Sequence, residues 1–388
     1  MTLPNDPTLR VCQAVRLLRH LAVNLPSPLN IAFDPVPASH LAACEHLVSQ
    51  AFAACGVQQL RFCHDTLAQL SSFEVLISRR LSQALPSGPL DVGSHSEQLI
   101  ADFDFSPAPA GVQREVIASF DGTPLNIYSC GGADLPALLL ALPCGLPFEL
   151  CQDWVQGLAA QYRVFTWETR GLFGGAEHFD SLAVDTDAQV ADLFAVMDHF
   201  GQPAAHLMGI CGGAMIALCA AASQPERVRS LSLWHGDYTL GEDDWRTAHQ
   251  RNFEWLMEAA ASDREEAREL QKMFVDPATL MTTPEPIAHL ALYPYTNAEL
   301  FYRYARLNHA LNQTDLHAIL PYIEVPALVV AGDNDQTTHI GGSRHVARTL
   351  PQARLHIEQG GSHVAFFEHG RRSLPVALGF MEALLAAA

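Results

Sequence analysis

The chain has 388 residues, of which 49% are hydrophobic and 17% are charged, and its 23 Lys and Arg against 42 Asp and Glu give a formal net charge of -19. So high an apolar content excludes an intrinsically disordered chain. So acidic a chain is not expected to bind nucleic acid, because phosphate contacts require clustered Lys and Arg. The length predicts two domains, or one large domain with an appendage.

The 9 cysteines are scattered along the chain and form no C-x-x-C pair. This distribution predicts reduced thiols in an intracellular protein. The first residues contain no basic segment followed by an apolar run, so we expect no secretory signal. No uninterrupted apolar stretch reaches the ~18 residues that a membrane helix needs. We therefore expect a cytoplasmic protein that does not associate with membranes.

The first part of the chain, residues 1–107, is predicted to be a separate helical region. Apolar residues recur at helical spacing in segments that clusters of Pro and Ser separate, at 11–21, 41–55 and 73–85. The stretch His64-Asp65-Thr66-Leu67 is similar to acyl carrier domains but lacks their Asp-Ser-Leu attachment site. We interpret the region as a docking or dimerisation segment, through which the chain would form a homo-oligomer. A degenerate carrier-like domain is the alternative.

In residues 108–388, short apolar segments alternate with helical ones, which predicts an α/β domain with a mostly parallel sheet. Asp121-Gly122 predicts a hairpin between 114–119 and 125–130. The later strands are expected at 137–142, 163–167, 205–208, 228–234, 327–331 and 354–357. Residues at about 237–317 interrupt this alternation with helical segments. We predict that they form a helical cap inserted between the sixth and seventh core strands, over the sheet edge where such folds bind ligands.

One short motif, Gly209-Ile210-Cys211-Gly212-Gly213, stands where a predicted strand ends and a helix begins. A nucleophile on so sharp a turn requires very small residues two positions before and after it, and Gly209 and Gly213 meet that demand. The motif is the G-x-S-x-G nucleophile elbow with Cys in the Ser position. Over residues 112–386 the chain therefore resembles the α/β-hydrolase fold, and the resemblance implies that Cys211 is the nucleophile.

The resemblance also implies the partners of this nucleophile. Asp335 lies in a Gly-x-x-Asp loop after a strand, where the family often carries its triad acid, and His363 follows the last strand, where the family has its histidine. Asp237, at the end of the sixth strand, is the alternative acid, because thioesterases of polyketide and peptide synthetases usually carry it there. The backbone N–H groups of Gly212 and Leu146 are expected to form the oxyanion hole.

These placements predict acyl transfer through a thioester on Cys211. His363 would take the thiol proton or hold a thiolate–imidazolium pair, and the helix N-terminus is expected to lower the thiol pKa. Among the 18 histidines no pair has metal-ligand spacing such as H-E-x-x-H, so we expect neither a metal nor a cofactor.

A thiol nucleophile exchanges readily with thioesters, because the attacking and leaving groups are chemically alike. We therefore expect an acyl-thioester hydrolase or acyltransferase of polyketide, nonribosomal peptide or related acyl metabolism, with its substrate on coenzyme A or an acyl carrier protein. An enzyme similar to dienelactone hydrolases or polyhydroxyalkanoate synthases, which share the Cys elbow, is the alternative. A binding or scaffold protein on a hydrolase fold is the alternative outside catalysis.

Overall fold

A computed structural model describes residues 6–33, 38–63, 70–86, 90, 93–106, 108–174, 176–241, 245–281, 283–368 and 370–385. The chain divides into two compact units, one made of Met1–Pro107 and Arg268–Ala298 and the other of Ala108–Ala267 and Glu299–Ala388. Residues 268–298, which the sequence placed in the cap, thus cluster with the N-terminal region. The carrier-like stretch at His64 to Leu67 lies outside the described residues.

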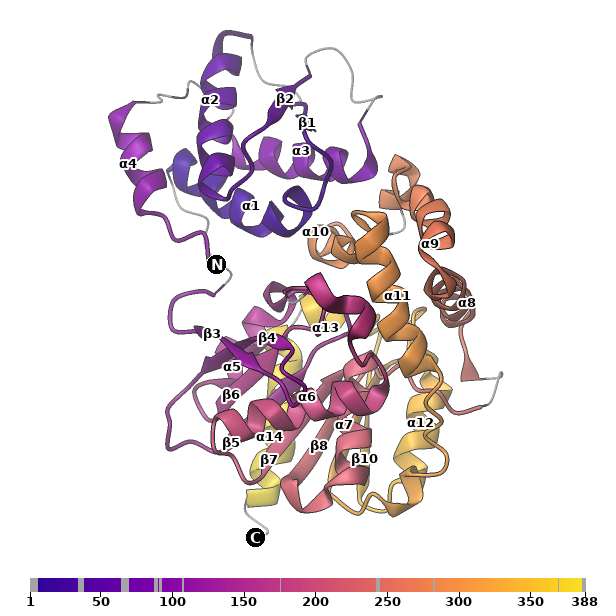
Figure 1. Cartoon of the computed structure of the whole chain (residues 1–388). Coiled ribbons are helices and arrows are strands. Elements are labelled where there is room, and N and C mark those ends of the chain that lie inside the picture. The colour runs from indigo at the N-terminus through magenta and orange to yellow at the C-terminus, as the bar shows by residue number, and fades with distance from the viewer. Residues whose placement is uncertain are drawn as a thin grey trace. The chain divides into compact units, whose positions relative to one another are not determined.

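The first unit is mainly helical (Figure 1). Its elements are α1 (Pro7–Ala22), β1 (Leu29–Ile31), α2 (Ala38–Ala54), β2 (Leu60–Phe62), α3 (Ser72–Ala84), α4 (Ser94–Asp102), η6 (Lys272–Phe274), η7 (Pro277–Met281), α10 (Ala288–Ala291) and η8 (Tyr293–Tyr295). Helices α1, α2 and α3 match the predicted helical segments, whereas the short parallel pair of β1 and β2 was not predicted. Helix α1 buries a stripe that includes Val11, Val15 and Leu18, and α10 packs against α1 and α3.

The second unit contains an eight-stranded sheet in the order β10-β9-β8-β7-β5-β6-β4-β3. The strands are β3 (Gln113–Ala118), β4 (Pro124–Cys130), β5 (Ala137–Ala141), β6 (Arg163–Trp167), β7 (Ala205–Ile210), β8 (Val228–Trp234), β9 (Ala327–Gly332) and β10 (Ala353–Glu358). The pairs β3–β4 and β4–β6 are antiparallel, and the other pairs are parallel. This sheet confirms the predicted α/β-hydrolase fold, including the hairpin around Asp121-Gly122.

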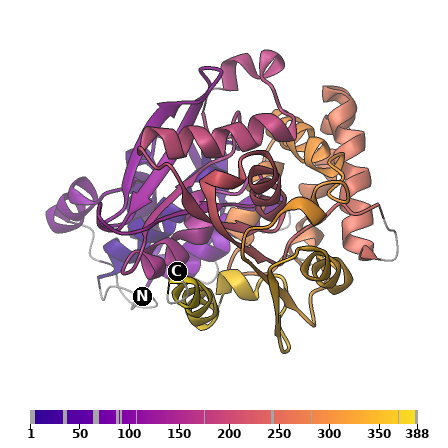
Figure 2. The ribbon, with the colours of Figure 1, turned by 90° about the horizontal axis from the view of Figure 1, so that it is seen from below.

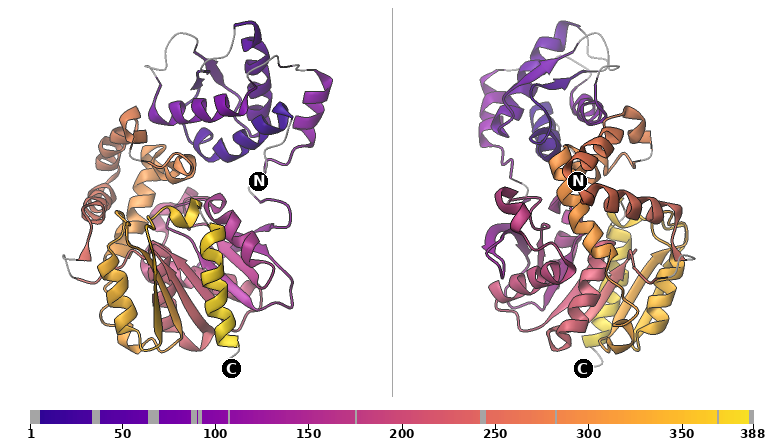
Figure 3. Two further views of the ribbon diagram at one scale, coloured as in Figure 1. Left: turned by 180° about the vertical axis from the view of Figure 1, so that it is seen from behind. Right: turned by 45° about the vertical axis from the view of Figure 1, so that its right-hand side comes forward.

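Helices cover both faces of this sheet, so β5, β7 and β9 are buried along their whole length and consist largely of apolar residues. The covering helices include α5 (Gln152–Leu158), α6 (Thr186–His199), α7 (Gly212–Ser223), α12 (Ile340–Thr349) and α14 (Gly370–Leu385). Helix α6 packs on α7, and α14 packs on α5; Figure 2 shows α6 and α14 on opposite sides of the sheet. Figure 3 shows α14 lying along the sheet, and α12 packs beside β9 and β10.

The remaining helical elements of the chain are η2 (Phe148–Cys151), η3 (Ala176–Ser181), η4 (Pro225–Arg227), α8 (Ala248–Ser262), α9 (Arg264–Gln271), α11 (Ala298–Asn312), η9 (Leu320–Tyr322) and α13 (Ala365–Glu368). Helices α8, α9 and α11 lie in the insertion between β8 and β9, the sixth and seventh strands of this sheet in chain order. In the part of the chain that the structure describes, none of the helices combines the length and apolar character needed to cross a bilayer.

A buried ion cluster ties the loop after β6 to the body of the sheet. The guanidinium of Arg170 is fully buried and donates to Asp192 at 2.7 and 2.8 Å and to Asp121 at 3.0 Å. Ser119 donates a further hydrogen bond to Asp192 at 2.5 Å. Because unpaired charges are costly inside a protein, this cluster fixes the loop that follows β6.

Candidate active site

Cys211 lies at the sharp turn between β7 and α7. Its backbone has φ 51° and ψ -122°, a conformation that residues other than glycine rarely adopt. Its N–H donates to the carbonyl of Trp234 at 3.0 Å, which anchors the turn to β8. A Cβ at Gly209 would collide with the Gly213 carbonyl, and a Cβ at Gly213 would collide with the Ala141 carbonyl. Both small residues are therefore required by the close approach of the backbone, as the elbow motif predicts.

The surroundings of Cys211 favour a protonated thiol. Burial raises the pKa of the thiol well above its usual value, and the carboxylate of Asp237 and then that of Asp335 raise it further. The N–H of Gly212, at the start of α7, lowers the pKa but does not outweigh these effects. The helix N-terminus thus acts in the expected direction, but burial and two nearby anions raise the thiol pKa by more than it lowers it. A base must remove the proton when the thiol reacts.

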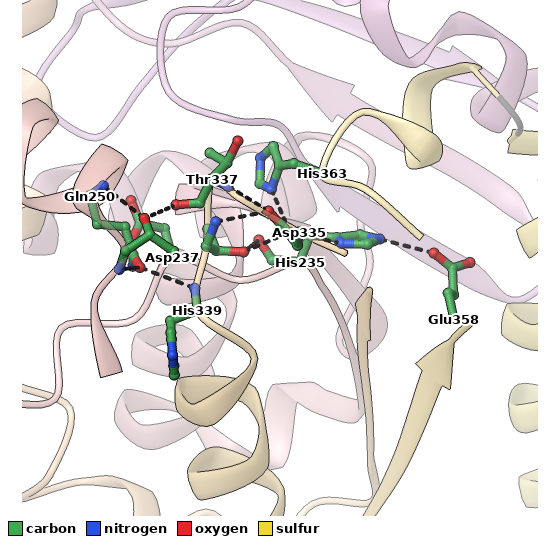
Figure 4. Close-up of polar contacts among 10 residues, drawn as sticks. His235, Asp237, Gln250, Asp335, Thr337, His339, Glu358 and His363 are labelled. Carbon is green, nitrogen blue, oxygen red and sulfur yellow. Dashed lines mark hydrogen bonds and ion pairs between the residues drawn. The ribbon is translucent and has the colours of Figure 1, made fainter. Parts of the chain in front are cut away.

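Asp335 and His363 are joined by a hydrogen bond (Figure 4). The Nδ1–H of His363 donates to Oδ2 of Asp335 at 3.0 Å. The same carboxylate accepts from the N–H groups of Thr337 and Thr338 at 2.8 and 2.9 Å, from the Thr338 hydroxyl at 2.9 Å and from His235 at 3.2 Å. Burial raises the pKa of Asp335, but these bonds, with those from His235 and His363 largest, lower it to well below its usual range. The ionised carboxylate orients His363 so that Nε2 faces away from it, as a triad histidine requires.

Asp237, the alternative acid, has a different partner. Its Oδ1 accepts a hydrogen bond from Nε2 of Gln250 on α8 at 2.7 Å. The amide oxygen of Gln250 accepts from the backbone N–H groups of Thr247 and His339, each at 3.0 Å, and this fixes the amide orientation. Burial raises the pKa of Asp237, although Gln250 and the charge of His363 lower it. Among the described residues, Asp335 is thus the carboxylate hydrogen-bonded to His363. The triad role of Asp335 stays a prediction.

Two residues of this site belong to no recognised sequence motif. One is Gln250, and the other is His235, which directly follows β8 and has both ring nitrogens bonded to carboxylates, at 3.2 Å to Asp335 and 3.1 Å to Glu358. Burial lowers the pKa of His235, but the bonds to these two carboxylates outweigh it and raise the pKa to about 9. Only its place after a strand at the ligand-binding edge of the sheet could have drawn attention to His235.

The two predicted oxyanion donors differ in their surroundings. The N–H of Gly212 interacts with the Cys211 sulfur, so it lies next to the predicted nucleophile. The N–H of Leu146 donates to the carbonyl of Pro143 within a tight turn, at 3.2 Å. Because Leu146 already has this acceptor, its oxyanion role stays a prediction that requires the turn to loosen when substrate binds.

Helix α11 supplies side chains next to the predicted oxyanion loop. Asn308 donates to the sulfur of Cys144 at 3.4 Å, and the ring of Tyr304 lies where a Cβ on Gly145 would be. Gly145 has φ +74°, and its N–H donates to the Thr169 hydroxyl at 2.9 Å. The insertion between β8 and β9 therefore contributes directly to the surroundings of this loop.

His235, Asp335 and His363 place potential ligand atoms within 4.8 Å of one another. Both nitrogens of His235, however, bond carboxylate oxygens, and its raised pKa of about 9 keeps the ring protonated. A protonated imidazole has no lone pair to give a metal. The set is therefore a hydrogen-bonded ion network.

The chain resembles known hydrolases over most of its second unit. Residues 144–370, more than half of the chain, match the family described as alpha/beta hydrolase fold. The pimeloyl-[acyl-carrier protein] methyl ester esterase of Chromobacterium violaceum is 33% identical over 193 residues, which cover 48% of this chain and 71% of the esterase. The polyketide synthase ThaQ of Burkholderia thailandensis is 29% identical over 266 residues, which cover 65% of this chain and 12% of ThaQ.

A solved structure shows the same architecture. The enol-lactonase from Burkholderia xenovorans LB400 is 20% identical, with a TM-score of 0.56, over 69% of this chain and 100% of the lactonase. At this identity the likeness concerns the fold alone. The matched family spans the elbow, the Asp335 loop and His363. The chain therefore belongs to the alpha/beta hydrolase fold family, as an enzyme of the hydrolase type.

Proposed function

We propose that the protein is an acyl-thioester hydrolase or acyltransferase that forms a covalent acyl-Cys211 intermediate, with Asp335 and His363 completing its triad. The observation that carries the proposal is the cysteine itself, at φ 51° on the turn where this fold places its nucleophile. The hydrogen bond of 3.0 Å between His363 and Asp335 supports the assignment of base and acid.

In the first half-reaction, His363 Nε2 takes the proton of Cys211 while the sulfur attacks the carbonyl carbon of the thioester. The N–H of Gly212 would stabilise the negative oxygen that develops. The bond from the carbonyl carbon to the leaving sulfur then breaks, and the imidazolium of His363 returns the proton to the departing thiolate. The products are a free thiol and a new thioester on Cys211.

In the second half-reaction, water or another acceptor attacks the acyl-Cys211 carbonyl, with His363 again as the base. The acyl-enzyme keeps the reactivity of a thioester, so it can pass its acyl group to water, an alcohol or an amine. The relatives support a carrier-bound acyl group as substrate, since one is named as an esterase of an acyl carrier protein conjugate and another as a polyketide synthase. We infer a place in polyketide, nonribosomal peptide or related acyl metabolism.

Intact-protein mass spectrometry tests the proposal. The protein is incubated with acyl thioesters of coenzyme A and of N-acetylcysteamine that carry short to long acyl chains, and adducts are mapped by peptide digestion. We expect an acyl adduct on Cys211 that is absent from Cys211→Ala. Cys144→Ala is the matched control, because Cys144 is a second buried thiol near Cys211. An adduct that survives in Cys211→Ala, or no adduct and no thiol release with any thioester, contradicts the proposal.

A second candidate is hydrolysis of an oxygen ester by the same residues, because the relative with 33% identity is named as a methyl ester esterase. The two candidates predict different selectivity. A thioesterase should have a higher kcat/KM for an acyl thioester than for the methyl ester with the same acyl group, and an esterase should show the reverse order. Neither substrate should turn over if the chain is a binding or scaffold protein.

A further inference from the structure

Four ionisable side chains form a continuous hydrogen-bonded chain, which we call the ion chain: Glu358, His235, Asp335 and His363 (Figure 4). Glu358 ends β10, His235 follows β8, and Asp335 and His363 come from the loops after β9 and β10. The contacts along the chain measure 3.1, 3.2 and 3.0 Å. Beyond Glu358, the hydroxyl of Ser373 on α14 donates to its other oxygen at 2.6 Å.

The bonding pattern fixes the charge of His235. An ionised carboxylate can only accept hydrogen bonds, so a nitrogen that bonds one must carry the proton. Both nitrogens of His235 face carboxylates, and the side chain is fully buried between Asp335, which is 2% exposed, and Glu358, which is 15% exposed. His235 is therefore a buried imidazolium.

We propose that His235 is a positioning residue of the triad: its imidazolium holds the Asp335 carboxylate in place and offsets part of the negative charge that this carboxylate presents to His363. This inference rests on the proposed function, because it assigns the base role to His363. It adds a buried cation that bonds the same carboxylate oxygen of Asp335, Oδ2, as His363 does.

The backbone at His235 supports a specific need for this side chain. Its φ of 45° lies in the left-handed region, where glycine would fit without strain. The conformation is held by the His235 N–H, which donates to the Val330 carbonyl at 2.9 Å. The Thr338 hydroxyl, which donates to Asp335, lies 3.4 Å from the His235 carbonyl. These contacts tie the residue to β9 and to the loop that carries Asp335, so the ring is aimed at that carboxylate.

The other titratable groups near the ion chain leave His235 as the cation beside Asp335. The ring of His363 lies 5.8 Å from that of His235, at 78° to it. The charge of His356 acts on Glu358, while Asp237 and His249 interact with His363. Burial together with His363 lowers the pKa of His249, so it does not replace His235 as the cation.

Two substitutions test the charge of His235. His235→Gln removes the charge and keeps a donor for only one of the two carboxylates, so Asp335 is left fully negative beside His363. We expect the acidic limb of the kcat/KM profile for an acyl thioester to move to higher pH by about one unit, or about tenfold in proton concentration. Glu358→Gln keeps the acceptor for His235 but removes the outer anion, which leaves more of the His235 charge to act on Asp335, so the limb should move to lower pH. A merely structural role would lower activity or stability without these opposite shifts.

Imidazole NMR provides a readout that needs no substrate. With ¹⁵N-labelled histidine, we expect His235 to show both ring N–H signals at pH 7 and the titration of His363 to move upward in His235→Gln. A neutral His235 at pH 7, or a His363 titration that is unchanged in both variants, overturns the inference. If His235→Gln does not fold, Glu358→Gln and the wild-type His235 signals still decide the charge. Because these titrations need no acyl adduct, they fail or succeed independently of the proposed function.

Discussion

Asparagine in place of Asp335 should separate the two candidate acids, and the structure sets the size of the effect. The carboxylate of Asp335 accepts five hydrogen bonds, and every one of its partners is a donor. An asparagine amide group would point its own N–H donors at some of these partners, whichever way it turned. The change also leaves His235 cationic and buried with one carboxylate fewer. Removal of one member of a buried ion pair costs about 3–5 kcal/mol, so we expect the free energy of unfolding to fall by that amount.

Activity should fall further than stability alone explains. An asparagine cannot stabilise the imidazolium of His363, and loss of the acid in comparable triads lowers kcat by about 10⁴-fold. We expect Asp335→Asn to release thiol from an acyl thioester at least about 10³-fold more slowly per folded molecule.

The matched control is Asp237→Asn. Asparagine retains an oxygen to accept the Gln250 bond of 2.7 Å. We expect a rate within about tenfold of wild type, since the His363 contact is kept, and stability within about 1 kcal/mol. The rates come from a colorimetric thiol assay and the stabilities from urea unfolding. Unimpaired thiol release by Asp335→Asn, together with a large loss in Asp237→Asn, would show that Asp237 is the acid.

Three further changes test other parts of the structure. Arg170→Met leaves Asp192 buried without its cation, so unfolding in urea should require about 3–5 kcal/mol less free energy, while the rate per folded molecule changes little. The pKa of His235 is raised from 6.5 to about 9, so the protonated ring stabilises the folded state by ~3 kcal/mol below pH 6.5. This stabilisation is lost as the pH rises through 9. His235→Gln should remove that part of the pH dependence in unfolding titrations. Gly145→Ala forces a side chain at φ +74° against the ring of Tyr304, so KM should rise as the loop shifts, with the acyl adduct still mapping to Cys211.

Local sterics explain why the elbow could be predicted from the sequence. The requirement for Gly209 and Gly213 comes from backbone atoms within a few residues or on the adjoining strand, and it leaves a direct mark on the residue types. The strand and hairpin pattern is similarly local, since each buried strand needs its own apolar run. Asp335 and His363 were predicted from the resemblance to the α/β-hydrolase fold, which carries its acid and histidine in the loops after these strands.

Long-range partners could not be predicted in the same way. His235 contacts Glu358 across 123 residues of chain, and no spacing rule connects a histidine after one strand with a glutamate at the end of another. The grouping of 268–298 with the N-terminal region has a related cause. An amphipathic helix shows that one of its faces is buried, but not which part of the chain covers it.

The electrostatics of the site explain why a cysteine suits it. A cysteine nucleophile is commonly activated by cations that lower its pKa. Here burial and the carboxylates of Asp237 and Asp335 raise the pKa of Cys211, and the buried cation, His235, bonds Asp335 instead. The resting thiol is therefore protonated, and in the proposed mechanism His363 removes its proton as the sulfur attacks. A thiol is intrinsically far more acidic than a serine hydroxyl, so this transfer to His363 remains feasible where the same carboxylates would make a serine harder still to ionise. Under the proposed function, the nucleophile forms only when a carbonyl is in place to receive it, and the sulfur is protected between turnovers.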